Sequence, residues 1–262
     1  MPDILDAIVA RVREHLAQAP ADEAALREQA RAHRSRDFRA AIETGPHPAL
    51  IAEFKRRSPS KGPLREDAPL LDYCHSYQAA GASAVSILTN PDFGGDLLDL
   101  RQARESITIP LLRKDFIVDP RQVLQAAAAG ADCVLLIARI VAPAQLIELA
   151  VVAREHNLQT LIEVYEESEL ESALAAQPDL LGVNSRDLAT FEVDGSKFAR
   201  VAAALPAGVP LIAESGVTTR EQAVAASQAG ARGVLVGEAL MTADDPGEMA
   251  AELLGTAPAR QL

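Results

Sequence analysis

The chain has 262 residues, 48% of them hydrophobic and 24% charged, enough for one large core or two modest ones. Its 37 acidic and 25 basic residues give a net charge of −12, which opposes nonspecific binding to nucleic acid or an anionic membrane. The sequence has no run of about 18 apolar residues, so no membrane span is expected. The N-terminal stretch does not resemble a secretory signal. Two cysteines cannot form a disulfide framework, so we expect a reduced, cytoplasmic protein.

Residues 1–47 are predicted to form an N-terminal helical extension. A second helical stretch is expected to follow the first and to run through about Phe38. We interpret the extension either as a cap over one end of the domain that follows or as a contributor to its active site. The apolar face of the first helix is formed by Ile4, Ile8, Val12, Leu16 and Ala19.

A repeated pattern begins after this extension. AAGASAVSILT (79–89), AAGADCVLLIA (128–138) and QAGARGVLVGE (228–238) each carry Ala-Gly-Ala before an apolar run. Glycine after a helix suits the left-handed cap, and the run after it suits a buried strand. The spacing of about 50 residues predicts a further member, and AAQPDLLGVNS (175–185) lies at the expected place.

Four more apolar runs lie between these segments, at 49–55, 109–115, 158–164 and 209–215. Eight strands that alternate with helical stretches, at about 25 residues per unit, indicate a parallel sheet. We therefore predict one α/β domain over residues 1–262, a (β/α)8 TIM barrel with the 1–47 extension. An open doubly wound sheet is the alternative, but it would need a Gly-rich dinucleotide turn of the form G-x-G-x-x-G, which is absent.

Ionisable and amide side chains stand at the ends of five predicted strands. In a barrel of this kind, the carboxyl ends of the strands form the active site. Any one of these groups alone would be read as a surface charge, but five strands with the same polarity indicate a catalytic ring. Its charges nearly balance, which lowers the cost of burial and favours perturbed pKa values. The members are Glu53, Lys55, Lys114, Glu163, Asn184, Arg186 and Glu214.

Glycine-containing turns follow the last two predicted strands. Ser215-Gly216 and Gly237-Glu238 are either ordinary tight turns or a phosphate site, since backbone N–H groups at such turns bind anions. The five histidines are scattered without ligand spacing, so no metal site is expected.

Six motifs, in order, resemble those of the indole-3-glycerol phosphate synthase family. They are IAEFKRRSPSKG, LLRKDFIVDPRQV, LIEVYEESEL, LGVNSRDL, IAESGV and VLVGEALM, and the resemblance extends over essentially the whole chain, including the N-terminal extension. Phe54 and Ala239 depart mildly from the family pattern. The resemblance implies ring closure, decarboxylation and dehydration of 1-(2-carboxyphenylamino)-1-deoxyribulose 5-phosphate. No cofactor is implied, because the aromatic ring is its own electron sink.

The resemblance also implies roles for individual residues. Lys114 would be the general acid, and we expect its pKa to be lowered by burial near Lys55 and Arg186. Glu163 would move protons during dehydration, with Glu53, Asn184 and Glu214 in support. The implied substrate contacts are Lys55 and Arg186 for the carboxylate, Phe116, Leu135 and Leu188 as further substrate contacts, and Ser58, Ser215, Gly216, Gly237 and Glu238 for the phosphate.

The stretch RSPSKGPLRE (57–66) is long for a strand-to-helix connection and is predicted to be a lid, with Ser58 and Lys61 near the phosphate. A solvated loop without a role is the alternative. For the whole chain, two other functions stay open, a different phosphate-handling barrel such as phosphoribosylanthranilate isomerase and a noncatalytic ligand-binding barrel. The expected partner is a small phosphorylated molecule, and the chain is expected to be a monomer or weak homo-oligomer.

Overall fold

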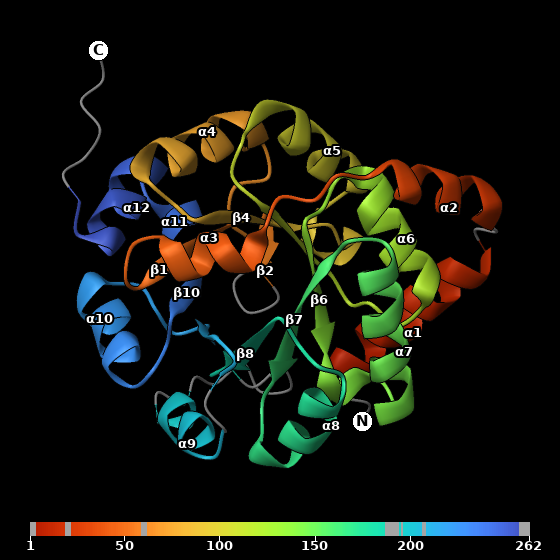
Figure 1. Cartoon of the computed structure of the whole chain (residues 1–262). Coiled ribbons are helices and arrows are strands. Elements are labelled where there is room, and N and C mark those ends of the chain that lie inside the picture. Colours follow the sequence, from red (N-terminus) through yellow and green to blue (C-terminus); the bar gives the residue numbers. More distant parts are fainter. Residues whose placement is uncertain are drawn as a thin grey trace.

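The fold is a closed eight-stranded parallel barrel surrounded by helices (Figure 1). The structure, a computed structural model, describes residues 4–18, 22–58, 62–186, 194, 196–205 and 208–256. The strand order is β1-β10-β9-β8-β7-β6-β5-β4, and β4 pairs with β1 to close the ring. The predicted TIM barrel and its eight strands are confirmed. The strands are β1 Ala49–Phe54, β4 Ala84–Leu88, β5 Leu111–Lys114, β6 Cys133–Ile137, β7 Gln159–Val164, β8 Leu180–Asn184, β9 Leu211–Glu214 and β10 Gly233–Val236.

Helices follow the barrel strands and form the outer ring. They are α4 Leu70–Ala80, α5 Leu97–Ser106, α6 Pro120–Ala129, α7 Pro143–Glu155, α8 Leu170–Ala175, α9 Lys197–Ala203, α10 Arg220–Gln228, α11 Glu238–Thr242 and α12 Pro246–Leu254. Short elements lie in the connections, namely the hairpin of β2 Arg57–Ser58 and β3 Gly62–Pro63, and the 3-10 turns η1 Pro91–Phe93, η2 Ala138–Ile140 and η3 Glu167–Glu169.

Local sequence signals set where α6 begins and ends. The Asp119 side chain accepts a hydrogen bond from Arg121 N, and Pro120 occupies the first turn, where its missing N–H costs nothing. Gly130 ends the helix with φ 91°. This left-handed conformation is unfavourable for residues that have a side chain, but not for glycine. This is one of the Ala-Gly-Ala glycines, so its predicted capping role is confirmed.

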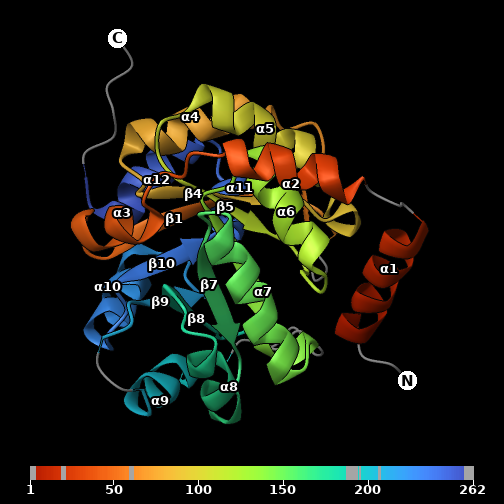
Figure 2. The ribbon, with the colours of Figure 1, turned by 45° about the vertical axis from the view of Figure 1, so that its right-hand side comes forward.

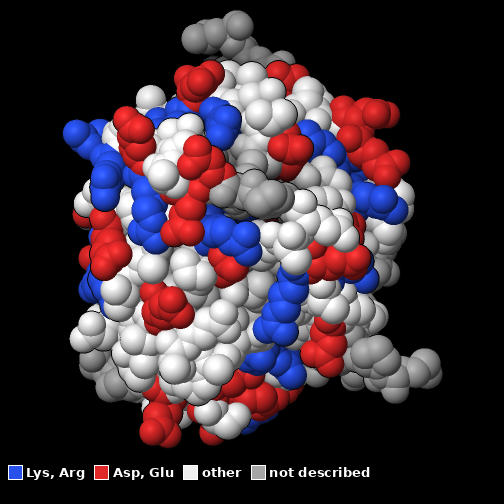
Figure 3. Space-filling view, turned by 90° about the vertical axis from the view of Figure 1, so that its right-hand side faces the viewer, with Lys and Arg blue, Asp and Glu red and all other residues white. Residues whose placement is uncertain are grey.

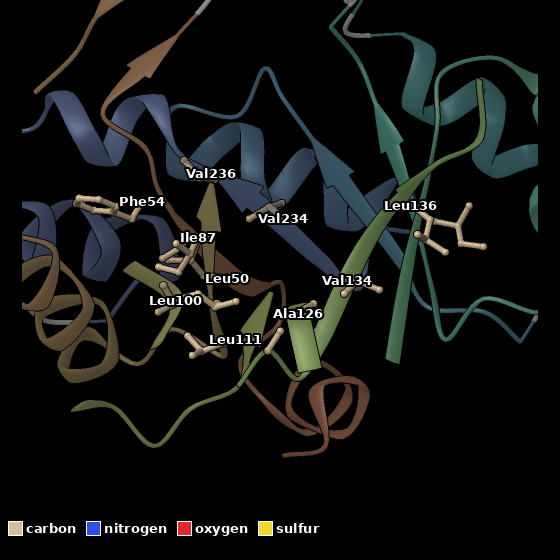
Figure 4. Close-up of a cluster of buried hydrophobic side chains, with 14 of the residues drawn as sticks. Leu50, Phe54, Ile87, Leu100, Leu111, Ala126, Val134, Leu136, Val234 and Val236 are labelled. Atoms are coloured by element: carbon tan, nitrogen blue, oxygen red, sulfur yellow. The ribbon is translucent and has the colours of Figure 1, made fainter. Parts of the chain in front are cut away.

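Alternation along each strand divides the core into two layers. On β1, Leu50, Ala52 and Phe54 face the helices, whereas Ala49 and Ile51 face the barrel interior. Figure 4 shows the outer layer, where Leu50 and Phe54 join side chains from β4, β5, β6 and β10. Full burial of each large aliphatic side chain contributes about 1.5–3 kcal/mol. The same alternation directs Glu53 into the interior.

The N-terminal extension reaches both ends of the barrel. Helix α1 Ile4–Gln18 packs Leu5, Ile8 and Val12 against the interior cluster at the carboxyl ends of the strands. Helix α2 Glu23–Ala32 lies along α6 (Figure 2). Helix α3 Phe38–Thr44 packs at the amino ends of β1 and β4. A cap over one end is therefore too narrow an interpretation, and the alternative, a contribution to the active site, fits α1, whose Ile4, Leu5 and Ile8 line the cavity.

The second helical stretch ends earlier than the sequence predicted. Helix α2 stops at Ala32, and residues 33–37 are not helical, so Phe38 starts a third helix instead of ending the second. Arg36 explains the break, because its backbone N–H donates to Asp132 Oδ1 at 2.7 Å and its guanidinium donates to Ile109 O at 2.8 Å. Asp37 then caps α3 by accepting from Ala40 N.

Basic and acidic side chains are interspersed on the face shown in Figure 3. None of the helices in the described part of the chain is both long and apolar enough to cross a membrane.

Candidate active site

A cavity at the carboxyl ends of the barrel strands brings together the predicted site residues. Apart from Leu188, which lies outside the described residues, each of them lines it. These are Glu53, Lys55, Ser58, Lys114, Phe116, Leu135, Glu163, Asn184, Arg186, Glu214, Ser215, Gly216, Gly237 and Glu238. Lys61 of the predicted lid also lies outside the described residues.

Lys114 is held between two carboxyl groups. Its Nζ lies 3.4 Å from Glu163 Oε2 and 3.4 Å from Glu214 Oε2. Only 2% of Glu163 and 1% of Glu214 are exposed. The ammonium group is therefore fixed at the floor of the cavity by strands β7 and β9.

The pKa of Lys114 is raised, so the expectation of a lowered value is wrong. Burial alone lowers it, but the carboxyl groups of Glu163, Glu214 and Glu53 raise it by more. From the sequence, Lys55 and Arg186 are expected near Lys114. In the structure, Lys55 Nζ pairs with Glu53 Oε1 at 2.8 Å, and Arg186 lies 3.5 Å from Glu238 Oε2. The two cations thus have carboxylate partners of their own.

Glu214 is the least compensated carboxyl group of the ring. Neither of its oxygens has a hydrogen-bond partner among the described residues, and the ion pair with Lys114 is long. Burial raises the pKa of Glu214 to about 8, and the neighbouring Glu163 adds to the rise while Lys114 opposes it. Burial thus favours the protonated form of Glu214.

Glu53 differs from Glu214 although both are deeply buried. Burial raises its pKa, but Lys55 and then Lys114 lower it by more, so the net pKa is below its usual value. The sequence sets three carboxyl groups, Glu53, Glu163 and Glu214, against three cations, but in the structure one of these cations, Arg186, pairs with Glu238.

Asn184 links the ring to the loop after β8. Its Nδ2 donates to Glu163 Oε1 at 3.2 Å, and its Oδ1 accepts from Arg186 N at 2.9 Å. The Asn184 amide thus holds Glu163 Oε1, while Lys114 lies near Glu163 Oε2.

The glycine turns after β9 and β10 have different geometries. Ser215 and Gly216 both have positive φ, at 64° and 78°, so the turn needs the freedom of glycine at least once. Gly237 has no positive φ, but a Cβ there would overlap Glu53 Oε1. Gly237 therefore makes room for a carboxyl group, a reason that the sequence did not reveal.

One wall of the cavity is apolar and includes residues that sequence reasoning missed. The rings of Phe93 and Phe116 stack with centroids 5.8 Å apart and an interplanar angle of 29°. Phe93 is the aromatic residue of the short turn after β4. Its position directly after a barrel strand is the sequence signal that could have indicated a residue of the cavity wall. Further residues missed are Leu88, Ile137, Val217 and Leu235. Ile4, Leu5 and Ile8 of α1 also line the cavity, in agreement with the alternative that the extension contributes to the site.

No group of three or more His, Cys, Asp or Glu side chains within the described ranges could hold a metal ion. The site instead combines a buried ammonium, neighbouring carboxyl groups and an aromatic wall. This set can donate and accept protons beside a flat apolar ligand.

Comparisons with known proteins give a consistent result. The family model described as indole-3-glycerol phosphate synthase matches residues 5–253. The indole-3-glycerol phosphate synthase of Albidiferax ferrireducens is 43% identical over 264 residues, which cover 98% of this chain and 100% of that protein. The one from Rhodopirellula baltica is 44% identical over 246 residues, covering 92% and 95%.

Solved structures of lower identity share the fold. A mutant tryptophan synthase alpha-subunit from Pyrococcus furiosus superimposes with a TM-score of 0.63 at 16% identity, covering 80% of this chain and 99% of that chain. At this identity the likeness shows the barrel alone. The family match and the relatives over nearly the whole length show more, namely that the chain belongs to the indole-3-glycerol phosphate synthase family.

Proposed function

We propose that the chain converts 1-(2-carboxyphenylamino)-1-deoxyribulose 5-phosphate into indole-3-glycerol phosphate, with Lys114 as the acid of ring closure. The observation that carries this assignment is the position of Lys114 Nζ, 3.4 Å from both Glu163 and Glu214 in a cavity walled by Phe93 and Phe116. A fixed proton donor beside an aromatic surface suits attack by an aryl ring on a ketone.

In ring closure, the aryl carbon that bears the carboxylate attacks the ketone carbon of the sugar chain, and the carbonyl electron pair moves to oxygen. Lys114 donates a proton to this oxygen. An alkoxide is far more basic than an amine, so the ammonium remains a competent donor even with its raised pKa. Carbon dioxide then leaves, and the electrons of the broken carbon–carbon bond restore the aromatic ring.

Dehydration completes the indole. The new hydroxyl group leaves as water with a proton from an acid, and the adjacent CH2 group loses a proton to a base. We assign this proton traffic to Glu163, whose oxygens are held by Asn184 and Lys114. Over the whole reaction, the substrate takes up one proton at the ketone oxygen and one at the leaving hydroxyl group, and it gives one back from the CH2 group. The net uptake of one proton matches the loss of a negatively charged carboxylate as neutral CO2.

Substrate binding is assigned to the groups around this ring. Lys55 and Arg186 are the cations for the substrate carboxylate, and Ser58 with the backbone of Ser215, Gly216, Gly237 and Glu238 is assigned to the phosphate. Since Glu238 pairs with Arg186 through its side chain, its part at the phosphate would fall to its backbone N–H. Phe93, Phe116 and Leu135 would contact the aryl ring.

A fluorescence assay tests the function directly. The chain has no tryptophan, so the indole product can be followed with little background from the protein. Formation of indole-3-glycerol phosphate from the aryl ribulose phosphate supports the proposal. A phosphoribosylanthranilate isomerase would instead form that aryl ribulose phosphate from phosphoribosylanthranilate, and a noncatalytic barrel would bind without turnover.

We further propose that the protein acts in the cytoplasm as a monomer or weak homo-oligomer. Light scattering across a tenfold range of concentration tests the second statement, and a fixed dimer at every concentration would contradict it.

A further inference from the structure

A buried polar network lies behind the aromatic wall of the cavity. At its centre, Asp115 accepts four hydrogen bonds, from Thr89 Oγ1 at 2.7 Å, Asn90 Nδ2 at 3.0 Å, Arg113 at 2.9 Å and Phe116 N at 2.8 Å. The four side chains of this network are at most 5% exposed. A carboxylate with this many partners holds all of them in fixed positions.

Asn90 connects the network to the turn that carries Phe93. While its amide donates to Asp115, its Oδ1 accepts from Asp92 N at 3.0 Å and so caps the turn η1. Its backbone O accepts from Phe93 N at 3.1 Å and from Gly95 N at 3.0 Å. The place of the Phe93 ring is therefore tied to the side chain of Asn90.

Phe116 is fixed from the other side of the same network. Its backbone N–H donates to Asp115, and its carbonyl oxygen accepts from Gln122 Nε2 at 3.0 Å. Gln122 also accepts from Val118 N at 2.8 Å, which holds the rest of the loop between β5 and α6. The backbone on both sides of the Phe116 ring is thus anchored.

The hydrogen bond from Asn90 to Asp115, next to the one from Thr89, joins these two halves, and Asn90 is the member that also caps the turn of Phe93. Phe93 lies on the loop after β4 and Phe116 on the loop after β5, and their rings stack 5.8 Å apart in the cavity wall. We propose that Asn90 and Asp115 are positioning residues that set the place of Phe93 against Phe116 and thereby the fit of the cavity to the aryl ring of the substrate. This inference rests on the proposed function, since it presumes an aryl substrate.

Two substitutions at Asn90 separate this role from simple capping. Asn90→Ser keeps a side chain that caps helical turns well, but its hydroxyl is too short to replace the amide at Asp115. Asn90→Asp keeps the cap oxygen and places a second carboxylate against Asp115, so the effect should be larger. The matched control is Asp96→Ala, which removes the cap of α5 in the same loop and leaves the link to Asp115 intact.

The measurements are KM and kcat for the parent substrate and for a substrate with a methyl group on the aryl ring. For Asn90→Ser, we expect KM to rise about tenfold with kcat within about threefold of the wild type, and the preference between the two substrates to change by about tenfold. A misfit of one methylene has a comparable effect on specificity. Asp96→Ala should lower the thermal midpoint while the substrate preference stays at the wild-type value.

The outcomes are distinguishable. If Asn90→Ser retains the wild-type KM and substrate preference, or if Asp96→Ala changes the preference equally, the positioning role is wrong. If the wild-type chain forms no indole product at all, the proposed function itself fails. Should Asn90→Asp not fold, Asn90→Ser still decides between these results.

Discussion

Gly182 of β8 lies directly against the carboxyl group of Glu214 on β9. A Cβ at position 182 would overlap Glu214 Oε1 at a distance that non-bonded atoms do not reach. Gly237, after β10, has the same relationship to Glu53 on the neighbouring β1. Two of the three ring carboxyl groups therefore occupy space that a glycine on an adjacent strand, or directly after one, leaves open.

Gly182→Ala should displace Glu214 and with it one carboxyl neighbour of Lys114. We expect kcat to fall by about 10²-fold or more, because a misplacement of about 1 Å in a catalytic group has such an effect. Steady-state kinetics, with circular dichroism to verify folding, checks this. Gly247→Ala on α12 is the control, since its neighbours are Asp245 and Ser76 and it does not line the cavity. Wild-type kcat for a folded Gly182→Ala variant would contradict the argument.

Lys114→Ala should remove most of the ring-closure activity while substrate binding persists. Loss of a positioned acid typically reduces the rate by about 10²–10⁴-fold. Single-turnover formation of indole, together with a binding titration, separates the two effects. If turnover stays at the wild-type level and only affinity weakens, Lys114 is a binding residue. Lys55→Ala offers a comparison, because it removes a cation that is paired with Glu53 at 2.8 Å.

The sequence was sufficient to predict the eight strands and the ring, because alternation and strand-end polarity are local signals. Glu53 follows Ile51 by two positions, so the pattern that buries Ile51 in the barrel also directs Glu53 inward. Parallel strands then align these ends in one layer. The prediction of the ring therefore requires no knowledge of tertiary contacts.

The electrostatic pairing could not be predicted in the same way. Whether Arg186 lies near Lys114 or near Glu238 depends on side-chain directions across three strands, and the structure pairs it with Glu238. The wrong prediction of a lowered Lys114 pKa followed from the expectation that Arg186 lies near Lys114. Phe93 was missed because a loop carries it, and the part of α1 in the cavity stayed one of two alternatives because a preceding helix carries it. Periodicity along a strand contains no information about either.

Glu214 should make folding stability fall as pH rises through the neutral range. Its pKa in the folded state is about 8, above its ordinary value near 4.5 in an unfolded chain. Between these values the unfolded chain releases the proton while the folded chain retains it, so the free energy of unfolding decreases with pH. Below about pH 4.5 the contribution is complete, and above about pH 8 it is lost.

Glu214→Gln removes this proton equilibrium. The free energy of unfolding of the variant minus that of the wild type should therefore increase steadily from pH 5 to pH 8, whatever this difference is at pH 5. Urea denaturation at four or five pH values measures the difference. A stability difference that is constant across this range would mean that Glu214 is ionised throughout.

The lid predicted at residues 57–66 can be tested from its base. Arg56 anchors the start of this stretch by donating to Gly94 O at 3.1 Å and by pairing with Asp99. The backbone of Leu64 donates to Arg56 O at 2.9 Å, so the two ends of the stretch meet. The segment between them follows β1, and Ser58 lines the cavity. A phosphate bound beside Ser58 would add contacts to this segment and close it over Lys114.

Bound product should therefore protect the peptide bond after Lys61 from trypsin. If cleavage requires the ligand-free loop, product at about 100 times its Kd should slow cleavage by up to about 100-fold. Lys61→Gln identifies the fragment, because cleavage at that bond disappears while cleavage at other basic residues continues. Inorganic phosphate alone should protect less, since it lacks the indole that contacts the aromatic wall. Equal cleavage rates with and without saturating product would show that residues 57–66 are a solvated loop and not a lid.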